Sequence, residues 1–231
     1  MGNITIAIDG FSSTGKSTIA KKLANTLGYV YVDTGAMYRA VTLFALENGY
    51  VINEEIDKKA LISSLDTINI TFKYNPQLGF AEVYLNGENV EAKIRTLEIS
   101  KYVSPVATIS EVRKMLVTQQ QKMGKDKGIV MDGRDIGTVV FPDAELKIFM
   151  TASPETRAKR RYLELNERGH DITYEAVLDN VTTRDKIDST REDSPLVKAS
   201  DAIEINNSEM NIEEQLVKIL DMANTLIQSS R

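Results

Sequence analysis

The residues with the clearest chemical meaning lie near the start of the chain, in the segment DGFSSTGKST. Gly10 and Gly15 enclose four residues, and Lys16 and Ser17 follow directly. Glycines allow consecutive backbone N–H groups to curl around an anion without a Cβ in the way. A lysine here can reach the β- and γ-phosphates of a nucleotide, and a serine hydroxyl can help to hold Mg²⁺. The segment therefore predicts a loop that binds a nucleoside triphosphate.

The surroundings of the loop support this interpretation. NITIAIDG, before it, is typical of a buried strand, and a helix is expected from Lys16 to about Leu27, ended by Gly28. The helix N-terminus adds the positive end of its dipole to the loop. The alternative is a glycine-rich turn with a surface lysine, which the spacing and the context disfavour. The loop alone leaves a GTPase, an ATPase and a small-molecule kinase open.

Three further clusters of charged residues stand at the ends of expected strands or helices. They are DTGAMYR from Asp33, DGRDIGTVVFPDA from Asp132, and TTRDKIDSTRED from Thr183. Ligands bind at the carboxyl ends of the strands in an open parallel sheet, so the first two clusters are expected near the glycine loop. Arginines there suit bidentate contacts with phosphate groups. This concentration of arginines indicates a second ligand that carries phosphate.

The elements that must position these clusters alternate between strands and helices. After the first strand and helix, strands are expected to end at Asp33 and to cover residues 128–133, 145–152 and 201–206. Further helices are expected over residues 36–47, from about 94 to 123 with an interruption at Pro105, and over 153–169, 173–193 and 211–227. The β-α-β-α opening favours a parallel sheet. In the last helix, the apolar stripe Ile212, Leu216, Ile219 and Leu220 is expected to pack in the core.

The middle of the chain has a different character. Residues 68–90, INITFKYNPQLGFAEVYLNGENV, alternate polar and apolar side chains with turn residues between them. Asn86-Gly87 is a strong signal for a hairpin turn. This segment predicts a small antiparallel sheet inserted into the α/β frame.

Composition excludes several other classes. A chain of 231 residues that is 42% hydrophobic suits one domain with a sizeable core. The net charge of −5 and the pI of about 5.1 argue against a broad nucleic-acid surface. The absence of cysteine and the single histidine, His170, exclude disulfides, cysteine catalysis and multi-histidine metal sites. No apolar run approaches the roughly 20 residues of a membrane span, and no signal peptide is visible, so a cytoplasmic location is expected.

Taken together, the motifs resemble those of the bacterial cytidylate kinases, a family of P-loop nucleoside monophosphate kinases. GFSSTGKST, VDTGAMYR, VMDGRDIGTVVFPDA, RAKRR and RDKIDSTRxxSPL occur in that order, and the resemblance runs over nearly the whole chain. Adenylate and shikimate kinases share the loop and the frame, but not DGRDIGTVVFPDA with the RDxxDxxR segment.

The resemblance implies an α/β P-loop NTPase fold, a parallel sheet flanked by helices, in a single domain of residues 1–231. The core would cover about 1–65 and 105–231, an antiparallel insert that binds the monophosphate about 66–104, and a helical lid about 155–175.

The resemblance also implies a role for each matching residue. ATP would be bound by Gly10, Phe11, Ser12, Ser13, Thr14, Gly15, Lys16, Ser17 and Thr18 of the loop, with Arg157, Arg160 and Arg161 in the lid. Arg39, Arg134 and Arg191 would hold the CMP phosphate, Ser104, Arg113 and Asp135 would read cytosine, and Arg184 and Asp188 would hold the ribose. Thr34 stands where the family often has serine, and the swap keeps the hydroxyl. The catalytic set would be Lys16, Asp132, Arg134, Arg184 and Arg191, with Ser17 on Mg²⁺ and either Asp132 or Asp33 orienting it through water.

Structural roles are the alternative for several of these residues. The segment RAKRR is also typical of an ordinary charged helix face. Arg184 and Asp188 could form a simple i,i+4 pair on a helix. Asp135 also suits the cap of a turn, and Ser104 a helix cap before Pro105.

For the chain as a whole, the resemblance implies the conversion of ATP and CMP, or dCMP, to ADP and CDP, or dCDP, by a monomer that binds neither nucleic acid nor membrane. A kinase for UMP or AMP, a nucleotide switch and an ATPase that acts on nucleic acid stay open. Asp135 argues against UMP, because a carboxylate can accept a hydrogen bond from cytosine N4, whereas O4 of uracil is itself an acceptor. The acidic pI disfavours the nucleic-acid ATPase.

Overall fold

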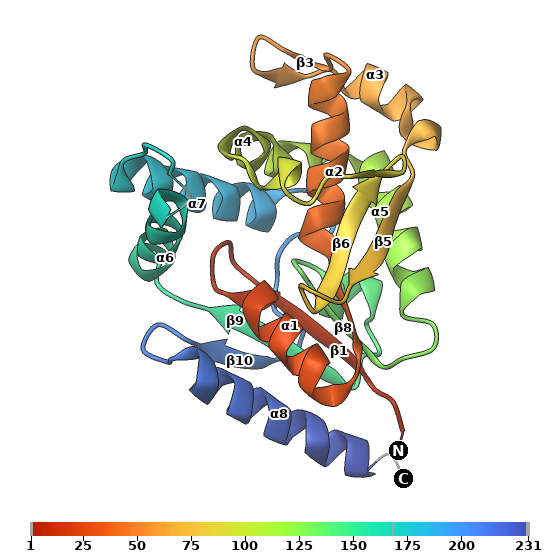
Figure 1. Cartoon of the computed structure of the whole chain (residues 1–231), viewed down its shortest axis with the longest axis vertical. Coiled ribbons are helices and arrows are strands. Elements are labelled where there is room, and N and C mark those ends of the chain that lie inside the picture. Colours follow the sequence, from red (N-terminus) through yellow and green to blue (C-terminus); the bar gives the residue numbers. More distant parts are fainter. Residues whose placement is uncertain (1, 168, 230–231) are drawn as a thin grey trace. The chain divides into compact units, whose positions relative to one another are not determined.

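The computed structural model describes residues 2–167 and 169–229 (Figure 1) and contains a five-stranded sheet. The strand order is β10-β9-β1-β8-β2, and β1 pairs in parallel with both β8 and β9, as β10 does with β9. The strands are β1 (Thr5–Gly10), β2 (Val30–Asp33), β8 (Ile129–Gly133), β9 (Leu146–Thr151) and β10 (Ile203–Asn206). The expected α/β fold with a parallel sheet is confirmed.

The chain divides into two compact units, Met1–Tyr31 with Asp126–Arg231, and Val32–Lys125. The helices of the first unit are α1 (Lys16–Leu27), α6 (Pro154–Glu167), α7 (Tyr174–Thr190) and α8 (Ile212–Ser229). Helices α1 and α8 pack together against the sheet, with Ile6, Ile19 and Ile219 in their common core. Helices α6 and α7 contact each other beyond the strand ends.

Local signals set the ends of several helices. Gly28 ends α1 in the left-handed conformation (φ 68°), and the N–H of Tyr29 donates to Ala24 O at 2.8 Å. The Oγ of Ser153 accepts the N–H of Thr156 at 3.1 Å, so Ser153 caps α6 as expected. Helix α7 ends at Thr190, three residues before the expected end at residue 193, because Arg191 has extended backbone angles (φ −61°, ψ 144°).

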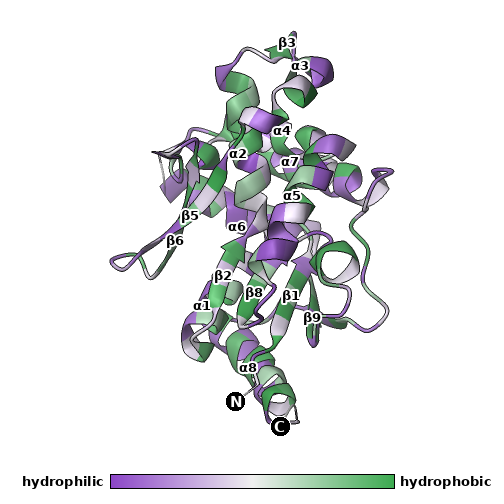
Figure 2. Ribbon diagram, turned by 90° about the vertical axis from the view of Figure 1, so that its right-hand side faces the viewer, coloured by the Kyte–Doolittle hydropathy of each residue, from purple (hydrophilic) through white to green (hydrophobic). Residues whose placement is uncertain are grey.

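The expected core stripe of the last helix is only partly correct. Ile219 is fully buried and Leu216 and Leu220 pack at the edge of the core, but Ile212 is 47% exposed. Ile212 is the first residue of α8, where little of the first unit covers it. Green apolar and purple polar residues alternate along α8 in Figure 2, while β1 and β8 are mostly green.

The second unit combines helices with small antiparallel sheets. Its elements are α2 (Thr34–Glu47), β3 (Val51–Ile52), β4 (Glu55–Ile56), α3 (Lys58–Ser63), β5 (Ile70–Asn75), β6 (Phe80–Leu85), β7 (Glu88–Asn89), α4 (Leu97–Val106) and α5 (Ser110–Met123). Strands β5, β6 and β7 form the expected antiparallel sheet. Asn86 (φ 49°) and Gly87 (φ 88°) form its second turn, and such positive φ angles are what this dipeptide supplies.

The expected helix from about residue 94, interrupted at Pro105, is wrong in detail. Helix α4 begins at Leu97 after the cap residue Thr96, and it runs through Pro105 to Val106. Proline in the last turn removes only one hydrogen bond, so the helix accommodates it. The break falls instead at residues 107–109. Ser104 is therefore a buried residue inside α4, and the helix-cap alternative for it is wrong.

The expected boundaries of insert and lid stay predictions. Residue 168, in the expected lid, lies outside the described residues. Among the described helices, none combines the length and the apolar character that crossing a membrane requires.

Candidate active site

The loop between β1 and α1 has a backbone that only glycine allows at its first position. Gly10 has a φ of +148°, and a Cβ there would lie 2.1 Å from the backbone oxygen of Met150 on β9. Gly15, just before α1, has a φ of +88°. The first glycine of the motif thus allows close packing on the neighbouring strand, and the second allows a left-handed turn into the helix.

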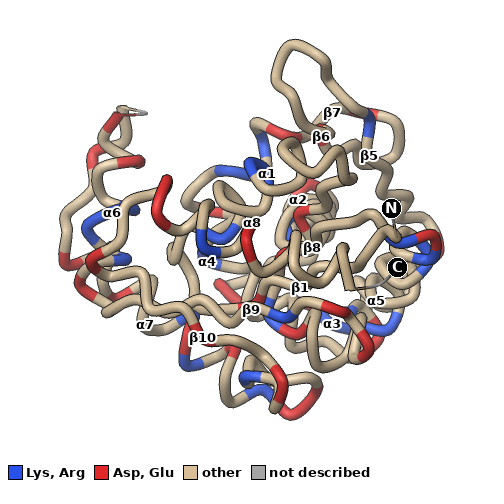
Figure 3. Tube along the Cα trace, turned by 90° about the horizontal axis from the view of Figure 1, so that it is seen from below, with Lys and Arg blue, Asp and Glu red and all other residues tan. Residues whose placement is uncertain are grey.

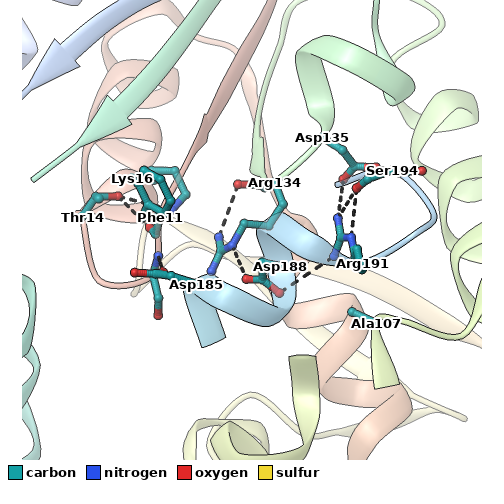
Figure 4. Close-up of polar contacts among 12 residues, drawn as sticks. Phe11, Thr14, Lys16, Ala107, Arg134, Asp135, Asp185, Asp188, Arg191 and Ser194 are labelled. Atoms are coloured by element: carbon teal, nitrogen blue, oxygen red, sulfur yellow. Dashed lines mark hydrogen bonds and ion pairs between the residues drawn. The ribbon is translucent and has the colours of Figure 1, made fainter. Parts of the chain in front are cut away.

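Lys16 points back into this loop. Its Nζ donates to the backbone oxygen of Phe11 at 2.6 Å and to Thr14 Oγ1 at 3.3 Å (Figure 4). Burial and the nearby charge of Arg134 lower the pKa of Lys16 to about 7. The oxygens that accept hydrogen bonds from this buried ammonium carry no net charge, so a nearby anion would stabilise its protonated form. A phosphate group is such an anion.

Ser17 and Asp132 form the pair best suited to a magnesium ion. Ser17 Oγ donates to Asp132 Oδ2 at 2.9 Å, and the hydroxyl of Tyr31 donates to Asp132 Oδ1 at 2.8 Å. Within the described residues, no three carboxylate or imidazole side chains gather as a metal cage. Mg²⁺ beside nucleotides needs only one or two protein oxygens, because phosphates and waters complete its shell. Ser17 and Asp132 therefore fit such an ion. Tyr31, which the sequence motifs do not include, holds the other oxygen of Asp132.

Helix α6 contributes three arginines with different surroundings. Arg157 is 3% exposed and donates to the backbone oxygens of Ala152 (2.9 Å) and Ser12 (3.0 Å), while its guanidinium lies 5.3 Å from the Phe11 ring centroid. Asp185 of α7 pairs with Arg157 and accepts the N–H of Ser12 at 3.1 Å. An ordinary charged face does not describe Arg157, because its guanidinium shapes the phosphate-binding loop.

The other two arginines of α6 differ in exposure and partners. Arg161 makes a partly exposed pair with Glu164 at 2.8 Å. Arg160 is half-buried and donates to Asn207 through two nitrogens. Blue and red residues gather along α6 and α7 in Figure 3. The charged-face alternative thus fits Arg161 better than Arg160.

A buried arginine–aspartate cluster lies at the end of α7 and after β8. Arg134 Nε donates to Asp188 Oδ2 at 2.8 Å (Figure 4). Arg191 donates to the backbone oxygen of Ser194 at 2.7 and 2.9 Å, and its nitrogens lie 3.9 Å from both Asp135 and Asp188. The structure thus brings four predicted residues together in one unit.

Charge in this cluster is unevenly balanced. Burial and the charge of Arg134 lower the pKa of Arg184 to about 10. Burial favours the neutral form of Asp188, but the charges of Arg134 and Arg184 outweigh it and keep its pKa below the usual value. The i,i+4 relation of Arg184 and Asp188 is thus only part of a larger cationic cluster.

Asp9, the residue before the loop, supports the segment that carries Asp135. Its carboxylate accepts the N–H groups of Ile136 at 2.8 Å and Gly137 at 2.7 Å. These donors open a turn of π-helix, Ile136–Val140. Asp135 itself precedes that turn, and it is Asp9 that caps it. Asp9 went unnoticed in the sequence because its partners lie more than a hundred residues away.

The remaining predicted residues belong to the second unit. Thr34 and Arg39 lie on α2, Ser104 on α4 and Arg113 on α5. Arg113 is buried over the ring of Tyr38, 5.6 Å from its centroid, and donates to the backbone oxygen of Ala107 at 3.3 Å. Arg39 donates to the backbone oxygen of Ile94 at 3.4 Å. Their roles stay predictions.

Asp33 has a different surrounding from Asp132, although both end strands. It accepts the N–H of Ala36 at 2.9 Å as the cap of α2, and it pairs with Arg95 at 2.8 Å. The sequence did not point to Arg95. Because Asp33 is already paired with a guanidinium, it is less suited to orient Mg²⁺ than Asp132, whose oxygens accept from the hydroxyls of Ser17 and Tyr31.

Comparisons with known proteins identify the family of this chain. The family profile described as cytidylate kinase matches residues 6–225. Proteins named cytidylate kinase from Flavobacterium psychrophilum and Flavobacterium johnsoniae are 62% and 63% identical, over 98% and 99% of this chain and 100% and 99% of their own lengths. One from Parabacteroides distasonis is 57% identical over 99% of this chain and all of its own. Among solved structures, an uncharacterised protein from Eubacterium ventriosum shares the fold, with a TM-score of 0.50 and 13% identity over 97% of this chain and 99% of its own.

Proposed function

This chain belongs to the cytidylate kinase family, and from that premise we propose that it transfers the γ-phosphoryl group of ATP to CMP and dCMP. One observation of the structure carries the proposal. The phosphate-binding loop follows β1, and Arg134 directly follows β8, the strand that pairs with β1, so Lys16 and Arg134 stand at the same edge of the sheet. An anion bound at this edge would stabilise both cations. The phosphoryl group in transfer is such an anion.

The chemistry needs positioning and charge neutralisation more than acid–base catalysis. A phosphate oxygen of CMP attacks the γ-phosphorus of ATP, and the bond from that phosphorus to the β–γ bridging oxygen breaks, which releases ADP. The CMP phosphate is already anionic near neutral pH, so no strong general base is required. Lys16, Arg134 and Arg191 stabilise the charge on the equatorial oxygens. Ser17 and Asp132 would hold Mg²⁺, which supplies further charge neutralisation on the β- and γ-phosphates when bound.

The remaining residues have roles in binding CMP and in closing the site. Arg39, with Arg134 and Arg191, holds the CMP phosphate, and Arg184 with Asp188 holds the ribose. The cytosine readers are Ser104, Arg113 and Asp135, and Thr34 supplies a hydroxyl. Arg157, Arg160 and Arg161 on α6 close over ATP and limit its hydrolysis by water. A monomeric, cytoplasmic enzyme stays a prediction.

The test is coupled release of ADP from Mg-ATP with CMP, dCMP, UMP, AMP or GMP as acceptor and a control without acceptor. We expect turnover with CMP and dCMP well above that with the other three. Equal turnover with and without acceptors would indicate a simple NTPase and overturn the roles of the arginines. Preference for AMP or UMP would overturn the cytosine readers alone.

A further inference from the structure

Asn207 is a fully buried side chain that the motifs of the chain do not include. It directly follows β10 and is 0% exposed. Its Nδ2 donates to the backbone oxygen of Thr14 at 2.7 Å and to Gln215 Oε1 at 2.8 Å. Its own N–H donates to the backbone oxygen of Thr151 at 2.9 Å. Asn207 therefore joins the end of the sheet and the start of α8 to the phosphate-binding loop.

Arg160 fixes the orientation of the Asn207 carboxamide. Its Nη1 donates to Asn207 Oδ1 at 3.0 Å and its Nη2 to the backbone oxygen of Asn207 at 2.8 Å. Because the guanidinium only donates, it selects the rotamer in which Oδ1 faces Arg160 and the NH₂ group faces Thr14. Both protons of that NH₂ group are then used, one on Thr14 and one on Gln215.

The contact with Thr14 has a direct consequence for the loop. The C=O and the following N–H of a trans peptide point in opposite directions, and no peptide among the described residues is cis. Holding the oxygen of Thr14 toward Asn207 therefore turns the N–H of Gly15 to the opposite side. Arg157 does the same for the peptide after Ser12, whose oxygen it binds at 3.0 Å. Phosphate-binding loops need consecutive N–H groups directed at the anion.

We propose that Asn207 is a positioning residue for ATP binding: it orients the Gly15 N–H by holding the oxygen of Thr14, and Arg160 holds Asn207 in place. The inference rests on the proposed function only in taking ATP as the ligand of this loop. It assigns to α6, through Arg160, a role in shaping the phosphate-binding loop as well as in closing over the nucleotide.

The sharpest variant is Asn207→Asp, which keeps the shape of the side chain and the acceptor for Arg160 but places an oxygen where Nδ2 faces Thr14. The control is Asn206→Asp. It adds the same charge one residue away on an exposed side chain whose Oδ1 only accepts from Ser208. Calorimetric titration measures the Kd of ATP and of CMP separately for each protein.

We expect Asn207→Asp to weaken ATP binding about tenfold or more, the size of one lost buried hydrogen bond, while CMP binding changes less than twofold. Asn206→Asp should leave both unchanged. Unchanged ATP binding in Asn207→Asp, or equal loss for both ligands, would overturn the proposal. Because binding is measured directly, a wild type that binds ATP but does not phosphorylate CMP would contradict the proposed function and leave this test intact.

A second variant keeps the test decisive if Asn207→Asp does not fold. Arg160→Met removes the support of the carboxamide, with Lys159→Met, an exposed neighbour on α6, as its control. We expect Arg160→Met to weaken ATP binding several-fold in the same selective manner, and Lys159→Met to have no effect. If both folded variants are available, the effect of the double variant should be smaller than the product of the two, since both act through one contact. Full ATP affinity in Arg160→Met would overturn the role of Arg160.

Discussion

Two arginine–aspartate pairs, one in each structural unit, have the same nitrogen–oxygen distance and different surroundings. Arg95 donates to Asp33 and Arg134 donates to Asp188, each at 2.8 Å. All four side chains are less than one-third exposed. Distance and burial alone therefore do not distinguish a structural ion pair from one that belongs to a binding site.

Both members of the first pair have a further partner. Arg95 also binds Glu91 at 2.8 Å, and the second oxygen of Asp33 accepts the N–H of Ala36. Burial opposes the charge of Arg95, but the two carboxylates outweigh it and raise its pKa. The carboxylates of Asp33 and Glu91 thus stabilise the charged form of Arg95.

Burial also opposes the charge of Arg134 in the second pair, but Asp188, Asp185 and Asp132 outweigh it and raise its pKa. The difference between the pairs therefore lies at the neighbouring Arg184. Arg134, Arg184 and Arg191 share the carboxylates of Asp135 and Asp188, and the pKa of Arg184 falls to about 10 through burial and the charge of Arg134. A dianionic phosphate nearby would stabilise the charged form of Arg184. A buried arginine with a lowered pKa, rather than the presence of ion pairs, thus separates the candidate active site from the scaffold.

The largest effect is expected from removal of Arg134. We predict that Arg134→Ala lowers kcat about 1,000-fold, because an arginine on the transferred phosphoryl group contributes on that scale. Asp188 keeps Arg184 and Arg191 as neighbours, so the melting temperature should change little. The coupled ADP assay and thermal denaturation measure the two quantities. Unchanged kinetics would remove Arg134 from the mechanism.

The matching change in the other pair should affect stability instead. Arg95→Met leaves the buried Asp33 without its cation, and we predict a loss of about 2 kcal/mol in the free energy of unfolding. Urea denaturation measures it, and Glu91→Gln, which leaves the pair intact, is the control with a smaller loss. If Arg95→Met lowered kcat as strongly as Arg134→Ala at unchanged stability, the distinction between the two pairs would fail.

Features with a local pattern were predictable from the sequence. Helix α1 has the expected bounds because the glycine motif and Gly28 mark both of its ends. The antiparallel sheet followed from alternation and from the Asn86-Gly87 turn. The error around residues 94–109 arose because Pro105 was taken as a break, while tertiary packing of α4 carries the helix through it.

Polar residues whose partners lie far away in the sequence could not be found in this way. Asp9 binds the N–H of Ile136, and Asn207 binds the oxygen of Thr14, 127 and 193 residues apart. Neither residue stands in a spacing that indicates its partner. Such contacts depend on the neighbours that the strand order brings together, and composition or periodicity does not encode them.

Buried charges on strand β1 and in the loop that follows it should make the stability of the protein depend on pH. Burial raises the pKa of Asp9 from 3.8 to about 7, although its hydrogen bonds to Ile136 and Gly137 oppose this. Between those pH values the folded state binds more protons at Asp9 than the unfolded state. The contribution of Asp9 to stability is therefore complete below about pH 4 and is lost as the pH rises to 7.

Lys16 has the opposite sign on the alkaline side. Its pKa falls from 10.5 to about 7, so between these values the unfolded state binds the extra proton and stability rises with pH. The pH range in which Asp9 affects stability ends near pH 7, where that of Lys16 begins. In each range the free energy of unfolding changes by at most about 1.4 kcal/mol per pH unit. We therefore predict a minimum in the contribution of this pair to the stability of the ligand-free protein near pH 7. Urea denaturation from pH 5 to 9 measures it, with Asp9→Asn expected to flatten the acid side and Lys16→Met the alkaline side. Saturating ATP should remove the alkaline slope, because phosphate oxygens restore the charge on Lys16, whereas a slope unchanged in Lys16→Met would show that another group titrates there.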